Sequence, residues 1–279
     1  MADPYRARRE WLRYEGTGQR DLYRELRERF LLRHAAEDGW VLDVGSGPGR
    51  FLPFIGGPRA LRVALDISRE MLRLVPGGWH FAGRTDRSPE RVLADGIRPP
   101  FAAALWSEVV LLGNTLGFAG HGAVPLLSAA EELVSPDGTL LIEVAPASGE
   151  RSRYLTRLPA SSVARLLRAP PRAVLARLDR EGFRPEPARH PTPQAFRRFT
   201  AGELRDGLME RGWELLETIA VAPALGTDPV RIEAVRGEPK AWPRLLALEE
   251  ELGHRPERWT DAAAVLVAAR RSSSKRMIK

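Results

Sequence analysis

Residues 41–50, Val-Leu-Asp-Val-Gly-Ser-Gly-Pro-Gly-Arg, constrain the fold of this chain more than any other stretch. A short apolar segment here predicts a buried strand, and it runs directly into a turn that contains Gly45, Gly47 and Gly49. Glycine has no Cβ, so it adopts positive φ readily and lets a ligand approach the main chain. The stretch is typical of a strand that ends in a ligand-binding turn, although an ordinary strand-to-helix turn could carry the same glycines.

Acidic residues lie at or near the ends of this strand and of two later apolar segments. Asp43 belongs to the first strand, residues 61–65 lead into Asp66, and residues 91–94 lead into Asp95. Ligands of open parallel sheets bind outside the carboxyl ends of the strands. Each aspartate alone would suit a helix cap or a turn. Together with the glycine turn, the three predict a single binding crevice.

Helical and strand patterns alternate along the rest of the chain. Segments expected to be helical have apolar residues at helical spacing: 4–14, 19–36, a helix begun at 50–55, 68–74, 124–134, 200–211 and 242–252. Segments expected to be strands are short and apolar: 40–44, 61–65, 91–94, 107–112, 139–144, 213–221 and 262–269. A tight turn is expected at 135–138 and a loop at 223–231. The alternation predicts an α/β fold with a doubly wound, mostly parallel seven-stranded sheet.

The domain organisation follows from changes in this pattern. Residues 1–36 form an N-terminal helical leader, and residues 37–270 form the main domain. Residues 145–193 interrupt it with two short amphipathic helical runs and many prolines, which we interpret as a helical lid over the sheet edge. A packed hairpin of helices is favoured there over a DNA-binding helix-turn-helix, because a double proline separates the runs. Residues 271–279 form a basic, disordered tail.

Composition excludes several classes of function. The chain has no cysteine, which rules out disulfides, cysteine-based metal sites and cysteine nucleophiles. We predict no metal site. No apolar run approaches the roughly 20 residues that span a bilayer, and the first ten residues are charged, unlike a signal peptide. We therefore expect a cytoplasmic protein without a membrane segment.

The net charge of +7 raises the question of nucleic-acid binding. Almost all of the positive charge comes from arginines, which are spread along the chain and interleaved with Asp and Glu. This distribution is typical of a solvated surface of mixed charge, not of one basic patch. Nucleic-acid binding stays open but is not favoured.

Five motifs occur in the same order as in a known family. They are Val41-Leu-Asp-Val-Gly-Ser-Gly-Pro-Gly49, Val63-Ala-Leu-Asp66-Ile-Ser, Val92-Leu-Ala-Asp95-Gly, Leu111-Leu-Gly-Asn114-Thr and Leu133-Val-Ser-Pro-Asp-Gly-Thr-Leu-Leu-Ile-Glu143. With these motifs the sequence resembles the class I S-adenosyl-L-methionine-dependent methyltransferases, which have a Rossmann-like fold. The resemblance implies that the last strand runs antiparallel between its two neighbours.

The resemblance also implies a site for S-adenosyl-L-methionine, which becomes S-adenosyl-L-homocysteine after methyl transfer. The glycine turn would hold the methionine part, Asp66 would accept both ribose hydroxyls, and Asp95 would accept from the adenine amino group. Ile67 and Gly96 would flank the adenine. The implied cofactor residues are Asp43, Gly45, Gly47, Gly49, Asp66, Ile67, Asp95, Gly96, Gly113 and Asn114.

A nicotinamide-dependent dehydrogenase is the main competing interpretation, because it also has a glycine turn followed by an acidic residue. Its fingerprint is G-x-G-x-x-G. Here the third glycine comes one residue early, and Arg50 stands at the expected position. Asp43 and Asp95 have no role in that scheme. The dehydrogenase is therefore disfavoured.

Methyl transfer from a sulfonium is an in-line displacement, which requires alignment of the reactants and exclusion of water more than a strong base. The candidate catalytic residues are Asn114, beside the acceptor, and His121, which could accept a proton. His121 lies between two glycines, which is also typical of an ordinary loop residue.

The acceptor is expected to be a small molecule with an N or O nucleophile. The motif Asn/Asp-Pro-Pro-Tyr/Phe, which places the amine of a nucleobase, is missing from the segment around Asn114. Arg151, Arg153 and Arg157 of the lid could recognise an anionic group, or could form a solvated face. Two alternatives stay open: an RNA (tRNA or rRNA) methyltransferase, and a non-catalytic S-adenosyl-L-methionine-binding protein. The oligomeric state also stays open.

Overall fold

The computed structural model describes only part of the 279-residue chain. The described residues are 19–77, 80–81, 84–85, 88–146, 150–152, 165, 167–170, 172–174, 185–187, 199–225 and 229–272. The predicted helix at 4–14, most of the predicted lid and the last residues of the predicted tail lie outside them.

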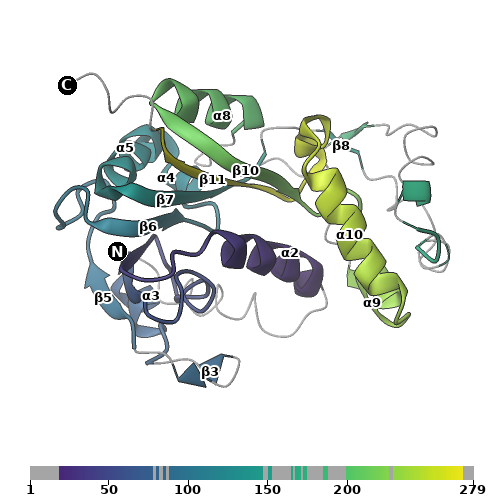
Figure 1. Cartoon of the computed structure of the whole chain (residues 1–279), viewed down its shortest axis with the longest axis horizontal. Coiled ribbons are helices and arrows are strands. Elements are labelled where there is room, and N and C mark those ends of the chain that lie inside the picture. The colour runs from purple at the N-terminus through teal and green to yellow at the C-terminus, as the bar shows by residue number, and fades with distance from the viewer. Residues whose placement is uncertain are drawn as a thin grey trace.

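The described residues form a seven-stranded sheet in the order β10-β11-β7-β6-β1-β2-β5 (Figure 1). The strands are β1 (Trp40–Val44), β2 (Leu61–Asp66), β5 (Glu90–Leu93), β6 (Trp106–Leu111), β7 (Val134–Val144), β10 (Trp213–Val221) and β11 (Ala264–Arg271). β11 is antiparallel to both of its neighbours, whereas the pairs from β7 to β5 are parallel. The predicted mostly parallel sheet and its antiparallel last strand are confirmed.

Helices and short hairpins surround this sheet. The helices are α2 (Gln19–His34), α3 (Arg69–Arg73), α4 (Thr115–Ala119), α5 (Ala123–Leu133), α8 (Ala201–Glu210), α9 (Pro229–Arg236) and α10 (Ala241–Gly253), with 3-10 turns at Gly120–Gly122 and Pro256–Asp261. The hairpins are β3 (His80–Phe81) with β4 (Arg84–Thr85), and β8 (Glu150–Ser152) with β9 (Pro185–Pro187). Among the described residues, no helix has the length and apolar composition needed to cross a bilayer.

Two apolar cores form because successive strand residues point to opposite faces of the sheet. Val41 packs in the core that contains Leu26 of α2 and the leucines of α10. Its neighbour Leu42 packs in the other core, with Leu126 of α5 and the apolar residues of α8. Figure 1 shows α2 and α8 on opposite sides of the strands. The central strands are therefore covered on both faces, as the nearly continuous apolar runs in the sequence predict.

The helix expected to begin at residues 50–55 is not formed. This segment is a series of turns, in which Phe54 N donates to Phe51 O at 2.8 Å. Pro53 has no N–H to donate, and Gly56 adopts φ +64°. The chain therefore passes from β1 to β2 without a crossover helix.

Other boundaries also differ from those expected. The loop predicted at 223–231 is wrong in part, because α9 begins at Pro229, and proline is favoured in the first turn of a helix. The tight turn predicted at 135–138 is absorbed into β7, where the pairing with β6 shifts register. β11 extends into the predicted tail, because Arg271 pairs with Trp213 of β10.

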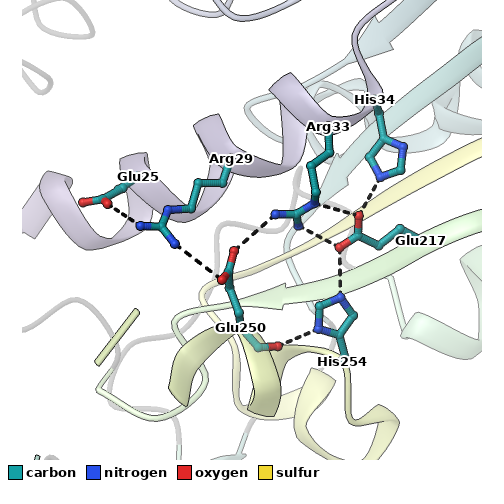
Figure 2. Close-up of polar contacts among 7 residues, drawn as sticks. All are labelled: Glu25, Arg29, Arg33, His34, Glu217, Glu250 and His254. Atoms are coloured by element: carbon teal, nitrogen blue, oxygen red, sulfur yellow. Dashed lines mark hydrogen bonds and ion pairs between the residues drawn. The ribbon is translucent and has the colours of Figure 1, made fainter. Parts of the chain in front are cut away.

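A cluster of charged side chains, which we call the distal cluster, connects α2 to β10 and α10 (Figure 2). Arg33 donates to Glu217 at 2.8 Å and to Glu250 at 3.2 Å. His34 and His254 also contact Glu217, at 2.6 and 2.9 Å. Burial disfavours the charge on Glu217, but these hydrogen bonds outweigh burial and lower its pKa to about 2.

We predict that Glu217→Gln lowers the free energy of unfolding at neutral pH. Because the folded-state pKa is lowered, the cluster stabilises the protein fully above the ordinary pKa of 4.5 and loses that contribution as the pH falls toward 2. The deficit of the variant should therefore shrink across this window in urea denaturation. The control is Glu214→Gln on the same strand, whose exposed pair with Arg270 should contribute little. Equal losses in the two variants would contradict the prediction.

Candidate functional site

The glycine turn after β1 has one open face. Gly45, Gly47 and Gly49 adopt φ of +71°, +55° and +76°. A Cβ at Gly45 would lie 2.5 Å from the Thr115 methyl, and one at Gly49 would lie 2.7 Å from Leu52. A Cβ at Gly47 would meet nothing within 4 Å. Two of the glycines therefore permit close packing of the protein, while the space into which a side chain at position 47 would point is open.

Asp43 is a buried acid without a hydrogen-bond partner among the described residues. Its exposed fraction is 1%, and neither carboxylate oxygen accepts a hydrogen bond there. Burial, and then the nearby charge of Asp66, raise the pKa of Asp43 to about 8, against the opposing charge of Arg50. Such a group is costly to the fold, and it is suited to receive a cationic donor from a ligand.

Asp66 connects the end of β2 to the glycine turn. Its Oδ2 accepts from Gly47 N at 2.8 Å, and its Oδ1 accepts from Ser68 N at 2.7 Å. Burial raises its pKa, while these backbone hydrogen bonds oppose the rise. Each carboxylate oxygen can accept more than one hydrogen bond, so Asp66 retains capacity for ligand hydroxyls.

The residues predicted to surround an adenine lie on the β2 and β5 side of the sheet. The Ile67 side chain is 74% exposed. Asp95 is also exposed, and its Oδ1 accepts from Ile97 N at 2.9 Å. Gly96 packs differently, because a Cβ there would lie 2.8 Å from side-chain atoms of Val44 and Leu126. Its lack of a side chain serves core packing.

A second sharp turn follows β6 and touches the glycine turn through Thr115. Gly113 and Asn114 have φ of +63° and +66°, so two successive residues are left-handed. Asn114 Oδ1 accepts from Ala145 N at 2.9 Å, which ties this turn to the end of β7. Asn114 Nδ2 is buried without a hydrogen-bond partner among the described residues, in a space that Gly117 leaves open.

His121 is exposed on the 3-10 turn between α4 and α5. The structure brings the turns of β1 and β6 into contact through Gly45 and Thr115, and joins Asp66 to Gly47. It shows no such link between His121 and these groups within the described residues.

Three further residues lie at this edge, and of these only Glu143, the last residue of the fifth motif, belongs to a sequence motif. Tyr23 Oη and Arg27 of α2 both donate to Glu143 Oε1, the latter at 2.9 Å. Glu143 Oε2 accepts from Gly113 N at 3.1 Å. An acid inside the apolar strand at 139–144 is the only hint that the sequence offers for such a cluster. The positions of Tyr23 and Arg27 fit an ordinary amphipathic helix.

Comparisons with known proteins were made with both the sequence and the structure. No protein-family model matches the sequence, and no curated protein matches it. Among solved structures, one similar chain comes from a complex that contains the Haloferax volcanii Trm112 methyltransferase activator. It has a TM-score of 0.51 and 17% identity, with 91% of this chain and 92% of that chain covered.

Magnesium protoporphyrin IX methyltransferase from Synechocystis, with bound S-adenosylhomocysteine, aligns with a TM-score of 0.50 and 13% identity over 91% of this chain and 84% of that one. The chain has the Rossmann-like fold of the class I methyltransferases. The cyclase SpnF shares this methyltransferase fold with the chain, with a TM-score of 0.50 and 12% identity over 88% of this chain and 80% of that one. Identities this low establish the fold alone.

We predict that Asp43→Asn stabilises the free protein, and more so at higher pH. Because burial raises the folded-state pKa from 3.8 to about 8, the folded protein holds a proton that the unfolded chain has released. The free energy of unfolding of the wild type should therefore fall as the pH rises between these values. The variant has no titrating group at position 43, so it lacks this decrease. Denaturant unfolding across this range measures the difference. Asp38→Asn, at an exposed acid paired with Arg59, is the control. A difference that does not change with pH would contradict the prediction.

Proposed function

We propose that the chain is a methyltransferase that uses S-adenosyl-L-methionine. One observation carries the proposal: Asp43 is buried and unpaired among the described residues, next to a glycine turn whose Gly47 faces open space, on a sheet with the class I fold. A buried unpaired carboxylate is costly unless a ligand completes its hydrogen bonds.

The residues present suit this cofactor. The Asp43 carboxylate would accept from the cofactor's ammonium group, and the main chain at Gly47 leaves space beside the methionine part. Asp66 has hydrogen-bonding capacity for the ribose hydroxyls, and its two backbone donors hold it in place. The exposed Ile67 side chain and Asp95 would contact the adenine. Gly96 would supply main chain only.

When bound, S-adenosyl-L-methionine would supply a methyl group activated by its sulfonium. The contribution of the chain is alignment, because in-line displacement depends on the geometry of the two reactants. Asn114, held by Ala145, would line the side of the site that faces the acceptor. The exposed His121 would take up the proton that the acceptor loses.

We further propose a small-molecule acceptor with an N or O nucleophile. The segment around Asn114 lacks the prolines of the motif that places a nucleobase amine, and the arginines are dispersed over the chain. Arg151 belongs to β8, while Arg153 and Arg157 lie outside the described residues. An anionic group on the acceptor would pair with such arginines.

A second candidate is a protein that binds the cofactor without transferring methyl. The observation that favours it is the shared fold with the cyclase SpnF, because a fold alone does not specify the reaction.

The purified chain would be incubated with S-adenosyl-L-methionine that carries an isotopically labelled methyl group, together with either a small-metabolite extract or bulk RNA. Label in the metabolite fraction and formation of S-adenosylhomocysteine support the proposal. Label in RNA, lost steeply with added salt, supports an RNA methyltransferase. Binding without turnover supports the second candidate.

We predict that Asp66→Ala weakens S-adenosylhomocysteine binding by about 1–3 kcal/mol, because charge-assisted hydrogen bonds to the ribose are lost. Titration calorimetry measures the affinity. Asp66→Asn, which keeps one acceptor oxygen, should lose less. Asp38→Ala, in the loop before β1 and at the opposite edge of the sheet, should bind like the wild type. Unchanged affinity in Asp66→Ala would refute the assignment of the ribose site.

A further inference from the structure

A buried polar cluster joins α2 to the turn after β6. Its members are Tyr23, Arg27 and Glu143, and the exposed fractions of Arg27 and Glu143 are 9% and 2%. Both donors reach one oxygen of Glu143, while the other oxygen accepts from Gly113 N at 3.1 Å. The cluster thus links a helix near the N-terminus to the main chain of a predicted site residue.

Stability alone does not explain the buried ion pair between Arg27 and Glu143. Removing both charges from water is costly, and apolar residues of similar volume often stabilise a protein as much. Arg27 also stacks on aromatic rings, 4.2 Å from the centroid of Tyr23 and 4.7 Å from that of Phe51. The guanidinium therefore has a defined position, and it orients the Glu143 carboxylate.

The segment that Glu143 holds is conformationally strained. Asn114 is left-handed at φ +66°, a conformation that is uncommon for residues with a Cβ although asparagine adopts it more often than most, and it directly follows the left-handed Gly113. Strain of this kind persists only where the surroundings impose it. Glu143 fixes the Gly113 N–H from one side. The Phe51 ring also packs close to this turn, because it would lie only 3.3 Å from a Cβ at Gly113.

The sheet order determines which part of a ligand this turn can affect. β6 adjoins β1 on one side, while β2 and β5 lie on the other side of β1. The residues assigned to ribose and adenine follow β2 and β5. The turn of Gly113 packs, through Thr115, against the glycine turn assigned to the methionine part. A disturbance at Gly113 should therefore reach the methionine half and spare the adenosine half.

We propose that Arg27 and Tyr23 are positioning residues, which act through Glu143 to hold the Gly113–Asn114 turn in the shape that receives the methionine half of the cofactor. This inference rests on the proposed function. It assigns to α2, which lies outside all the sequence motifs of the site, a part in cofactor selectivity.

The test compares two ligands that differ only in the methionine half: S-adenosylhomocysteine and methylthioadenosine, which lacks the amino-acid group. Arg27→Met should weaken S-adenosylhomocysteine binding about tenfold, as expected for disturbance of a buried charge-assisted hydrogen bond, and leave methylthioadenosine binding unchanged. The matched control is Arg33→Met. Arg33 is another arginine of α2, and it pairs with Glu217 of the sheet in the distal cluster of Figure 2. It should bind both ligands like the wild type.

Two further variants test the route of the effect, and the milder of them, Tyr23→Phe, guards against misfolding of Arg27→Met. Tyr23→Phe removes one donor to Glu143, and Glu143→Gln leaves Arg27 in place. Both variants should weaken the binding of S-adenosylhomocysteine and leave the binding of methylthioadenosine unchanged. Equal weakening of both ligands in these variants, or no weakening of either, overturns the inference while the proposed function stands. Failure of the wild-type chain to bind S-adenosylhomocysteine overturns the proposed function, and the inference with it.

Discussion

The contact between two sharp turns, one after β1 and one after β6, is the constraint on which the rest of the site depends. Gly45 can lie against Thr115 only because it lacks a Cβ. This contact packs the glycine turn against the neighbouring turn, while the space beside Gly47 stays open. With any other residue at position 45, the two turns would have to separate, and the edge of the sheet would lose its shape.

Buried glutamates accept main-chain N–H groups from loops at the edge of the sheet that carries the site and at the opposite edge. Glu143 accepts the main-chain N–H of the turn after β6, and Glu249 of α10 accepts two N–H groups from the segment after β10. Glu108 of β6 accepts N–H groups from the loop before β1 and from the turns after it. Burial raises the pKa of Glu108 and of Glu249 to about 7, because the charged form of each carboxyl is poorly solvated there. Main-chain groups in loops need such partners because they have none in the sheet.

The helix α2 shows how a segment without any motif becomes part of the site. Its apolar residues Leu22, Leu26 and Phe30 lie in the core beneath the sheet. Polar contacts then define its position at two points, with Arg27 in the middle of the helix at the site and Arg33 in its last turn at the distal cluster (Figure 2). Apolar burial supplies most of the attraction but little directional preference. The charged contacts determine the register of the helix on the sheet.

The sequence by itself determined the strands, the glycine turn and the placement of three aspartates at the carboxyl ends of their strands, because apolar runs and glycines act through local geometry. It predicted a helix at 50–55 wrongly, since Pro53 and Gly56 favour turns there. Only the tertiary structure decided that Asp43 is left unpaired among the described residues while Asp66 is held by two N–H groups, and that Arg27 reaches Glu143. The Gly47–Asp66 and Arg27–Glu143 contacts join residues 19 and 116 positions apart in the chain, and no spacing along the sequence encodes them.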